Sequence, residues 1–163
     1  VIGMAGKVMR ETHRMKGLLR FMELADGTFY APFEPDFNIT PYVAPYFCHR
    51  LGDQRWVIHD RKRDLAVLWD GKALQPVIVS DVLKQDLGPK LFSAGEVFYR
   101  NCWRLFTNSL AISSRHNPKL QRQLMPKKYW KYLPEVTDDP PGAPDGSPTD
   151  PRQGVLSLQQ KNP

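Results

Sequence analysis

The sequence lacks long apolar runs and has very little cysteine. No apolar stretch of the 163 residues approaches the roughly 20 residues that a membrane-spanning helix needs. The two cysteines, Cys48 and Cys102, have no CxxC or Cys/His metal spacing, and no secretory segment is recognisable. We therefore predict reduced thiols, a cytoplasmic location of bacterial type and no membrane insertion.

The familiar catalytic and cofactor-binding motifs are also missing. The sequence has no glycine-rich phosphate loop, no HExxH, no GxSxG and no dinucleotide-binding fingerprint. We therefore predict no cofactor and no metal site, and we lean against enzymatic activity for this chain alone.

Positive charge is in excess, and it is unevenly distributed. The chain carries 23 Lys and Arg against 17 Asp and Glu, a net charge of +6. Residues 136–163 have net charge −2, so residues 1–135, with 21 basic and 13 acidic residues, carry +8. The basic character therefore belongs to the part of the chain that we expect to fold.

The chain divides at about residue 135. Residues 136–163 contain six prolines and three glycines and almost no aromatic or β-branched residues, which predicts a disordered tail or linker. Residues 1–135 are predicted to form a single domain. Because the chain begins at Val1 within a helical pattern, we expect this domain to lack an N-terminal segment.

Apolar residues at three- and four-residue steps predict helices. Thr40 followed by Pro41 has the pattern of a helix start, and Gly17 and Gly52 mark helix ends. On the third helix, an apolar stripe that includes Cys102 is expected to face the core. The predicted helices cover residues 1–17, 40–51, 93–116 and 118–124.

β-rich segments separated by turn residues predict strands. A hairpin is expected around Ala25-Asp26-Gly27, and a three-stranded meander over residues 55–60, 65–70 and 73–79. Strands joined by short turns pair antiparallel. We therefore predict an α+β fold, an antiparallel sheet covered by helices, with a helical C-terminal part.

The segment 100–131 contains eight basic residues and no acidic residue. Surface helices usually interleave Glu with Lys or Arg, so this composition favours an anionic partner. The eight are Arg100, Arg104, Arg115, Lys119, Arg122, Lys127, Lys128 and Lys131. A second basic cluster occupies the first helix and the start of the next strand, at Lys7, Arg10, Arg14, Lys16 and Arg20. A groove would form if the two clusters shared a face.

Aromatic residues lie within the same stretch, including Trp103, Phe106 and Trp130. Unpaired bases stack on such rings while Lys and Arg hold the phosphates, so the stretch predicts contact with single-stranded DNA or damaged duplex. The alternative is that the rings are part of the core. The predicted DNA-binding residues are Arg14, Lys16, Arg20, Arg104, Arg115, Asn117, Lys119, Arg122, Lys127, Lys128, Tyr129, Trp130 and Lys131.

Four residues are weak catalytic candidates. His59 and Asp60 end a predicted strand, but adjacent strand residues point to opposite faces and would not form one dyad. Glu34 and Asp36, two residues apart, could share a face and offer oxygen ligands to a divalent cation, although two carboxylates are too few to specify a metal. Capping of the turn around Pro35 is the alternative role of these carboxylates.

Four strings in order carry a resemblance to a known family: residues 13–21 (HRMKGLLRF), 25–39 (ADGTFYAPFEPDFNI), 55–63 (RWVIHDRKR) with Asp70-Gly71 after it, and 115–135 (RHNPKLQRQLMPKKYWKYLPE). The chain resembles a bacterial domain of unknown function described as a probable DNA metabolism protein. Members are found fused ahead of a uracil-DNA glycosylase-like domain, or encoded beside a DNA-repair radical-SAM protein. The resemblance implies a setting in DNA repair or DNA modification.

We therefore predict a nucleic-acid-binding accessory domain of DNA repair or DNA metabolism. The first alternative is an enzyme that acts on damaged DNA as a glycosylase, lyase or nuclease. The second is a protein-interaction module that docks a uracil-DNA glycosylase-like domain or a radical-SAM protein.

Overall fold

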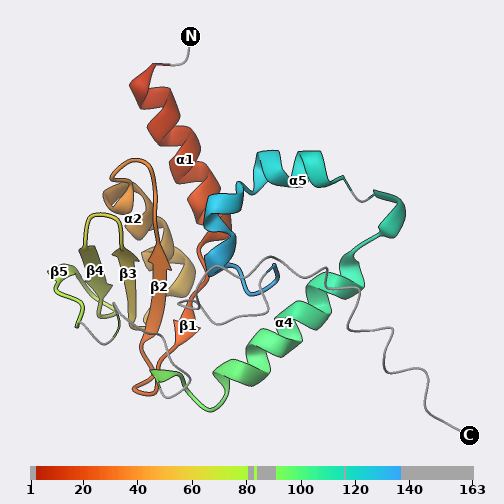
Figure 1. Cartoon of the computed structure of the whole chain (residues 1–163). Helices are drawn as coiled ribbons and strands as arrows, with labels where there is room; N and C mark the ends of the chain where they lie inside the picture. Colours follow the sequence, from red (N-terminus) through yellow and green to blue (C-terminus); the bar gives the residue numbers. More distant parts are fainter. Residues whose placement is uncertain (1–2, 81–82, 84–90, 116, 137–163) are drawn as a thin grey trace, which may run out of the picture.

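A computed structural model describes residues 3–80, 83, 91–115 and 117–136 (Figure 1). The helices are α1 (Met4–Leu18), α2 (Thr40–Leu51), α4 (Glu96–Leu110) and α5 (Pro118–Leu124), with 3₁₀ helices η2 (Ser113–Arg115) and η3 (Lys127–Tyr132). The strands are β1 (Met22–Glu23), β2 (Phe29–Phe33), β3 (Trp56–Asp60), β4 (Leu65–Trp69) and β5 (Leu74–Val77). The predicted tail, apart from Val136, lies outside the described residues.

The five strands form one sheet in the order β1-β2-β3-β4-β5, and the predicted α+β class is confirmed. The hairpin β1–β2 and the meander β3–β4–β5 pair antiparallel, as predicted. Strands β2 and β3 differ from the prediction because they run parallel, with Ala31 opposite Ile58. Helix α2 connects β2 to β3 and brings the chain back to the end of the sheet at which β2 begins. Parallel neighbouring strands require such a crossover.

The predicted helix boundaries hold best for α2 and least for α4. Helix α2 begins at Thr40 and is closed by Gly52, whose φ of 61° is a conformation that glycine adopts without strain. Helix α4 is shorter than the predicted 93–116. It ends at Leu110 because Ala111 is extended and the chain turns into η2.

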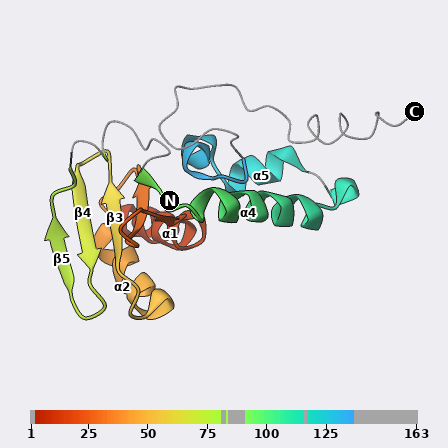
Figure 2. The same ribbon diagram turned by 90° about the horizontal axis from the view of Figure 1, so that it is seen from below.

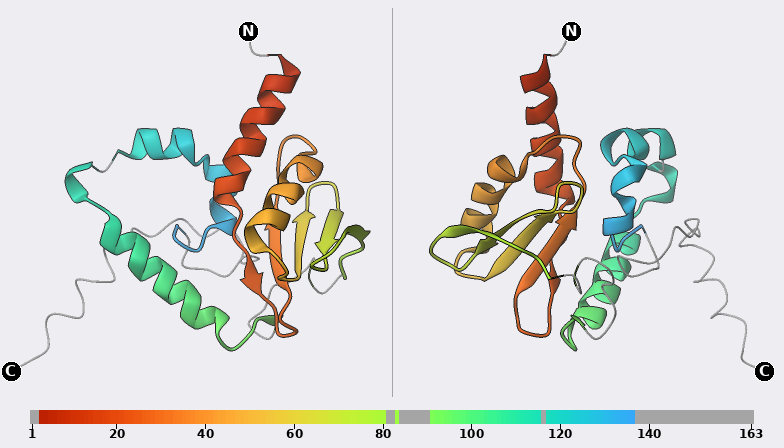
Figure 3. Two further views of the ribbon diagram at one scale, coloured as in Figure 1. Left: turned by 180° about the vertical axis from the view of Figure 1, so that it is seen from behind. Right: turned by 60° about the vertical axis from the view of Figure 1, so that its left-hand side comes forward.

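The two faces of the sheet are packed unequally. Helices α1 and α2 lie against one face of the sheet (Figure 3). Phe33, Trp56 and Ile58 on that face belong to the larger hydrophobic cluster, together with residues of both helices. On the other face, Tyr30, Ala66 and a few residues from outside the strands form a smaller cluster. Alternate residues of β2 and β3 point to opposite faces, so the larger core is built by one alternating set of side chains.

The 3₁₀ helix η3 is fixed to α1 through a buried carboxylate. The hydroxyl of Tyr129 donates to Glu11 Oε1 at 2.7 Å. Glu11 also accepts the backbone N–H groups of Asp36 at 2.8 Å and Phe37 at 2.9 Å. Although Glu11 is a charged residue, its side chain is only 5% exposed. It ties η3, α1 and the loop after β2 together.

Helix α4 projects away from the sheet (Figure 2). Its polar stripe, and not its apolar one, faces the rest of the domain. Glu96 is buried, and Arg100 and Arg104, one and two turns later, are partly buried. The apolar stripe that was predicted to join the core is instead exposed: Leu105 is 70% exposed, and Cys102 is exposed as well. Polar contacts from the inward stripe attach the helix, which explains the wrong prediction. Among the described residues, none of the helices is both long enough and apolar enough to span a bilayer.

Candidate nucleic-acid interface

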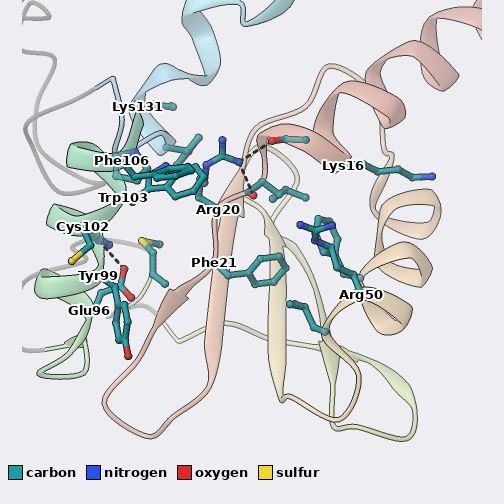
Figure 4. Close-up of a pocket in the computed structure, with 18 of the residues that line it drawn as sticks. Lys16, Arg20, Phe21, Arg50, Glu96, Tyr99, Cys102, Trp103, Phe106 and Lys131 are labelled. Atoms are coloured by element: carbon teal, nitrogen blue, oxygen red, sulfur yellow. Dashed lines mark hydrogen bonds and ion pairs between the residues drawn. The ribbon is translucent and has the colours of Figure 1, made fainter. Parts of the chain in front are cut away.

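An open groove of about 880 Å³ lies between two parts of the fold (Figure 4). One wall comes from the end of α1, residues 19–22 and α2, and the other from α4 with the end of η3 and Pro134. Lys16 and Arg20, from the first predicted basic cluster, line it together with Arg100 and Lys131, from the second. The two clusters therefore share a groove.

The wall formed by α1 and α2 holds two cations around one ring. The Lys16 ammonium nitrogen is 5.2 Å from the centre of the Tyr46 ring, and Arg50 Nη1 donates to the Tyr46 hydroxyl oxygen at 3.4 Å. Neither Lys16 nor Arg50 forms an ion pair with a carboxylate in the described part of the chain. Their charges are therefore available to an anion in the groove.

The opposite wall presents three rings from α4. Tyr99, Trp103 and Phe106 are spaced by four and three residues, which places them on one helix face. Trp103 is 39% exposed, and its ring centre lies 5.7 Å from that of Phe106, with the planes 32° apart. The alternative interpretation, in which the aromatic residues of the basic stretch are part of the core, therefore does not apply to Trp103 and Phe106.

A carboxylate joins the two walls. Glu135 forms an ion pair with Arg20 at 2.6 Å and accepts Trp103 Nε1–H at 3.1 Å. The Arg20 guanidinium also lies 5.6 Å from the centre of the Trp103 ring. Glu135 therefore sets the position of Trp103 and already neutralises most of the charge of Arg20.

Several cations of the acid-free stretch find carboxylates elsewhere in the chain. Arg100 pairs with Glu96 at 2.8 Å, and Lys131 pairs with Glu34 at 2.8 Å. Lys128 pairs with Asp36. The sequence argument looked for acids only within the stretch, so it counted these three cations as uncompensated when the fold compensates them.

The predicted DNA contacts divide into three groups. Lys16, Arg20 and Lys131 line the groove. Tyr129 is only 2% exposed, and we withdraw it, because a buried ring cannot stack on a base. The others lie outside the groove lining: Arg14, Arg104, Arg115, Asn117, Lys119, Arg122, Lys127, Lys128 and Trp130.

Some of the residues outside the groove have local structural roles. Asn117 Oδ1 accepts the backbone N–H of Leu120 and so caps α5. Trp130 Nε1–H donates to the carbonyl of Met125, and Arg104 Nε–H donates to the carbonyl of Pro134. Arg115, Lys119 and Arg122 are exposed on η2 and α5.

The histidine and aspartate at the end of β3 point to opposite faces, as predicted. His59 is 1% exposed; its Nδ1 shares a hydrogen bond of 2.7 Å with the Tyr30 hydroxyl, and its Nε2 lies 3.2 Å from Asp64 Oδ1. Asp60, also buried, pairs with Arg63 at 2.7 Å and accepts the backbone N–H groups of residues 62 and 63. The two side chains therefore serve separate hydrogen-bond networks.

Glu34 and Asp36 are neutralised by η3. Partial burial would raise the pKa of Glu34, but hydrogen bonds from Lys131 and Tyr132 outweigh it and lower that pKa. The hydrogen bond from Lys128 lowers the pKa of Asp36. Neither carboxylate lines the groove. Within residues 3–80, 83, 91–115 and 117–136, no three His, Cys, Asp or Glu side chains are placed to hold a metal ion.

Sequence reasoning missed three residues of the groove: Arg50, Tyr46 and Tyr99. Arg50 is an isolated charge in the last turn of α2, outside both basic clusters, so charge clustering could not find it. Tyr46 lies in the predicted helix 40–51, outside the basic stretch 100–131 in which aromatic residues were considered. The spacing of the aromatic residues 99, 103 and 106 does predict a shared helix face, but aliphatic residues at other positions of the same helix produce a second apolar face.

Comparison with known protein families matches residues 1–135 to DUF4130, a domain of unknown function. No curated protein and no solved structure shows significant similarity to the chain. The match covers every strand and helix described above, including both walls of the groove. The chain therefore belongs to the DUF4130 family of domains of unknown function.

Proposed function

We propose that this domain binds single-stranded or locally unpaired nucleic acid in the groove between α2 and α4. The observation that carries the proposal is that the two walls of the groove present different kinds of side chain. Lys16 and Arg50 supply unpaired cations on one side, and Tyr99, Trp103 and Phe106 supply exposed rings on the other.

This arrangement matches the two requirements of single-strand binding. Cations neutralise the phosphates, and rings stack on bases without regard to their identity. In an intact duplex the base faces are covered by their neighbours, so the rings of α4 favour a strand whose bases are unpaired. We place this activity in DNA repair or DNA metabolism, the setting that the family resemblance implies, with the domain acting as an accessory binding module.

The salt dependence of affinity tests the electrostatic half of the proposal. We expect affinity for a fluorescein-labelled oligothymidine to fall with salt at a log–log slope of about −1.4, from two phosphate contacts at about −0.7 each. Lys16→Ala should reduce the slope by about 0.7. Lys72→Ala, a surface lysine on the β4–β5 turn, is the control and should leave it unchanged. A flat salt response would contradict the proposal.

The rings are tested separately. We expect Trp103→Ala to weaken oligonucleotide binding by about 5- to 150-fold, the equivalent of one lost base stack. Phe98→Ala removes another exposed ring of α4, one that does not line the groove, and should change affinity by less than about twofold. Equal effects of the two substitutions would mean that the rings act through the stability of α4 and not through stacking.

A further inference from the structure

The outer face of α4 carries an exposed row of side chains with the spacing of a coiled-coil seam. Phe98, Cys102, Leu105 and Ser109 follow one another at steps of four, three and four residues. Phe98 is 64% exposed and Leu105 is 70% exposed. The large residues, Phe98 and Leu105, alternate along this row with the smaller Cys102 and Ser109.

Apolar side chains that are this exposed and regularly spaced mark an interaction surface. The inward stripe of α4 is held by Glu96, which accepts the backbone N–H of Glu23 in β1 at 2.9 Å, and by Arg104, which donates to the carbonyl of Pro134 at 2.8 Å. The outer row therefore cannot become the inner face without breaking these contacts. Its spacing fits an α-helix laid along α4.

The charge around the row indicates what kind of helix fits. From Val97 to Pro134 the sequence contains no acidic residue. Arg115, Lys119 and Arg122, just beyond the C-terminal end of α4, are exposed and form no ion pair with any described carboxylate. A second copy of the chain would bring like charges together, and Phe98 is the one ring among the four residues of the row, whose other members offer no surface on which bases stack. A helix with acidic residues beside its apolar face is the complement.

We propose that the outer face of α4 docks an amphipathic, acidic helix of a partner protein. Phe98 and Leu105 are the anchors, and the cations of η2 and α5 receive the acidic residues of the partner. This surface is distinct from the rings Tyr99 and Trp103 on the groove side of the same helix, although Cys102 borders both. Binding of the helix and binding of nucleic acid therefore depend on different side chains of α4.

The probe is a labelled 21-residue peptide of three heptads with Leu at a and d and Glu at e and g; its counterpart has Lys in place of Glu. By fluorescence anisotropy, we expect the acidic peptide to bind at least about tenfold more tightly than the basic one, given the charge of the surface. Leu105→Ala should weaken this binding by about fivefold or more, whereas Trp103→Ala should change it by less than about twofold.

Three kinds of result would overturn the inference. The first is equal binding of the two peptides, or binding that survives the double variant Phe98→Ala/Leu105→Ala. The second is sedimentation that shows a dimer lost on Leu105→Ala, which would make the face a contact between copies. The third is Leu105-dependent binding to anionic phospholipid vesicles. Because these substitutions leave Trp103, Lys16 and Arg50 intact, failure here is separable from failure of nucleic-acid binding.

Discussion

The sheet with α1 and α2, and helix α4 of the arm formed by α4, α5 and η3, use their apolar residues in opposite ways. In the first region Trp56 and Ile58 are wholly buried. On α4, Phe98 and Leu105 are exposed, and the helix is attached by polar contacts of Glu96 with Glu23 and of Trp103 with Glu135. The 3₁₀ helix η3 is attached both by the hydrogen bond of Tyr129 to Glu11 and by burial of the Tyr129 ring in the core. From this difference in burial we infer that the sheet region supplies most of the stability of the fold, whereas the arm presents rings and aliphatic side chains to ligands.

The largest expected effect is on the core side of this comparison. Trp56→Ala should lower the free energy of unfolding by about 3–5 kcal/mol, because it removes a large buried ring and leaves a cavity. Urea denaturation monitored by circular dichroism measures the change. Trp56→Phe is the control and should cost much less, because it also removes a buried indole N–H that has no hydrogen-bond partner among the described residues. A loss below about 1 kcal/mol for Trp56→Ala would contradict the proposed role of the core.

The next effect falls on the polar attachment of the arm. Glu11→Ala should lower the free energy of unfolding by about 2–4 kcal/mol, because two backbone N–H groups and the Tyr129 hydroxyl lose their acceptor. Tyr129→Phe removes one of these bonds and should cost about 1 kcal/mol. Should the two substitutions cost the same, Glu11 would be no more than a partner of Tyr129.

A smaller effect is expected from pH. The pKa values of Glu34 and Asp36 are lowered in the folded protein by contacts with Lys131, Tyr132 and Lys128. Their stabilisation is therefore full above the unfolded values, about 4, and is lost as pH falls through the lower folded values. Urea midpoints measured from pH 6 downward should fall in this range, and the double variant Glu34→Gln/Asp36→Asn should show a shallower fall. An unchanged pH profile in the double variant would argue against these pairs.

The smallest effect on the free energy of unfolding is expected from the exposed apolar residues of α4. Leu105→Ala should change the free energy of unfolding by less than about 0.5 kcal/mol, because its side chain is already in water and alanine favours the helix. The same urea experiment measures it. A loss comparable to that of Trp56→Ala would show that α4 packs its apolar face inside, and the contrast between the two regions would disappear.

Local patterns predicted the α+β class, the helix start at Thr40-Pro41 and the meander, because capping, turn residues and alternation act over a few neighbours. They could not show that β2 and β3 run parallel, which depends on where α2 returns the chain. The periodicity of α4 was correctly predicted, but periodicity alone does not say which face is buried.

The candidate site was predictable only in part. Lys16, Arg20 and Lys131 were found from charge clustering. Arg50 joins them only because α2 packs beside α1, whereas Lys128 lies outside the groove lining and pairs with Asp36, 92 residues away. Ion pairs between distant segments decide which cations remain available, and no pattern within the basic stretch contains that information.

The most direct test compares two pairs of cations by their effect on the dissociation constant for a labelled oligothymidine at one salt concentration. Lys16→Ala/Arg50→Ala removes the unpaired charges of the groove, and Lys119→Ala/Arg122→Ala removes an equal charge from the exposed surface of α5. We predict that the groove pair weakens binding by about tenfold or more and that the α5 pair changes it by less than about threefold. The reverse order would contradict the assignment of the groove as the nucleic-acid interface.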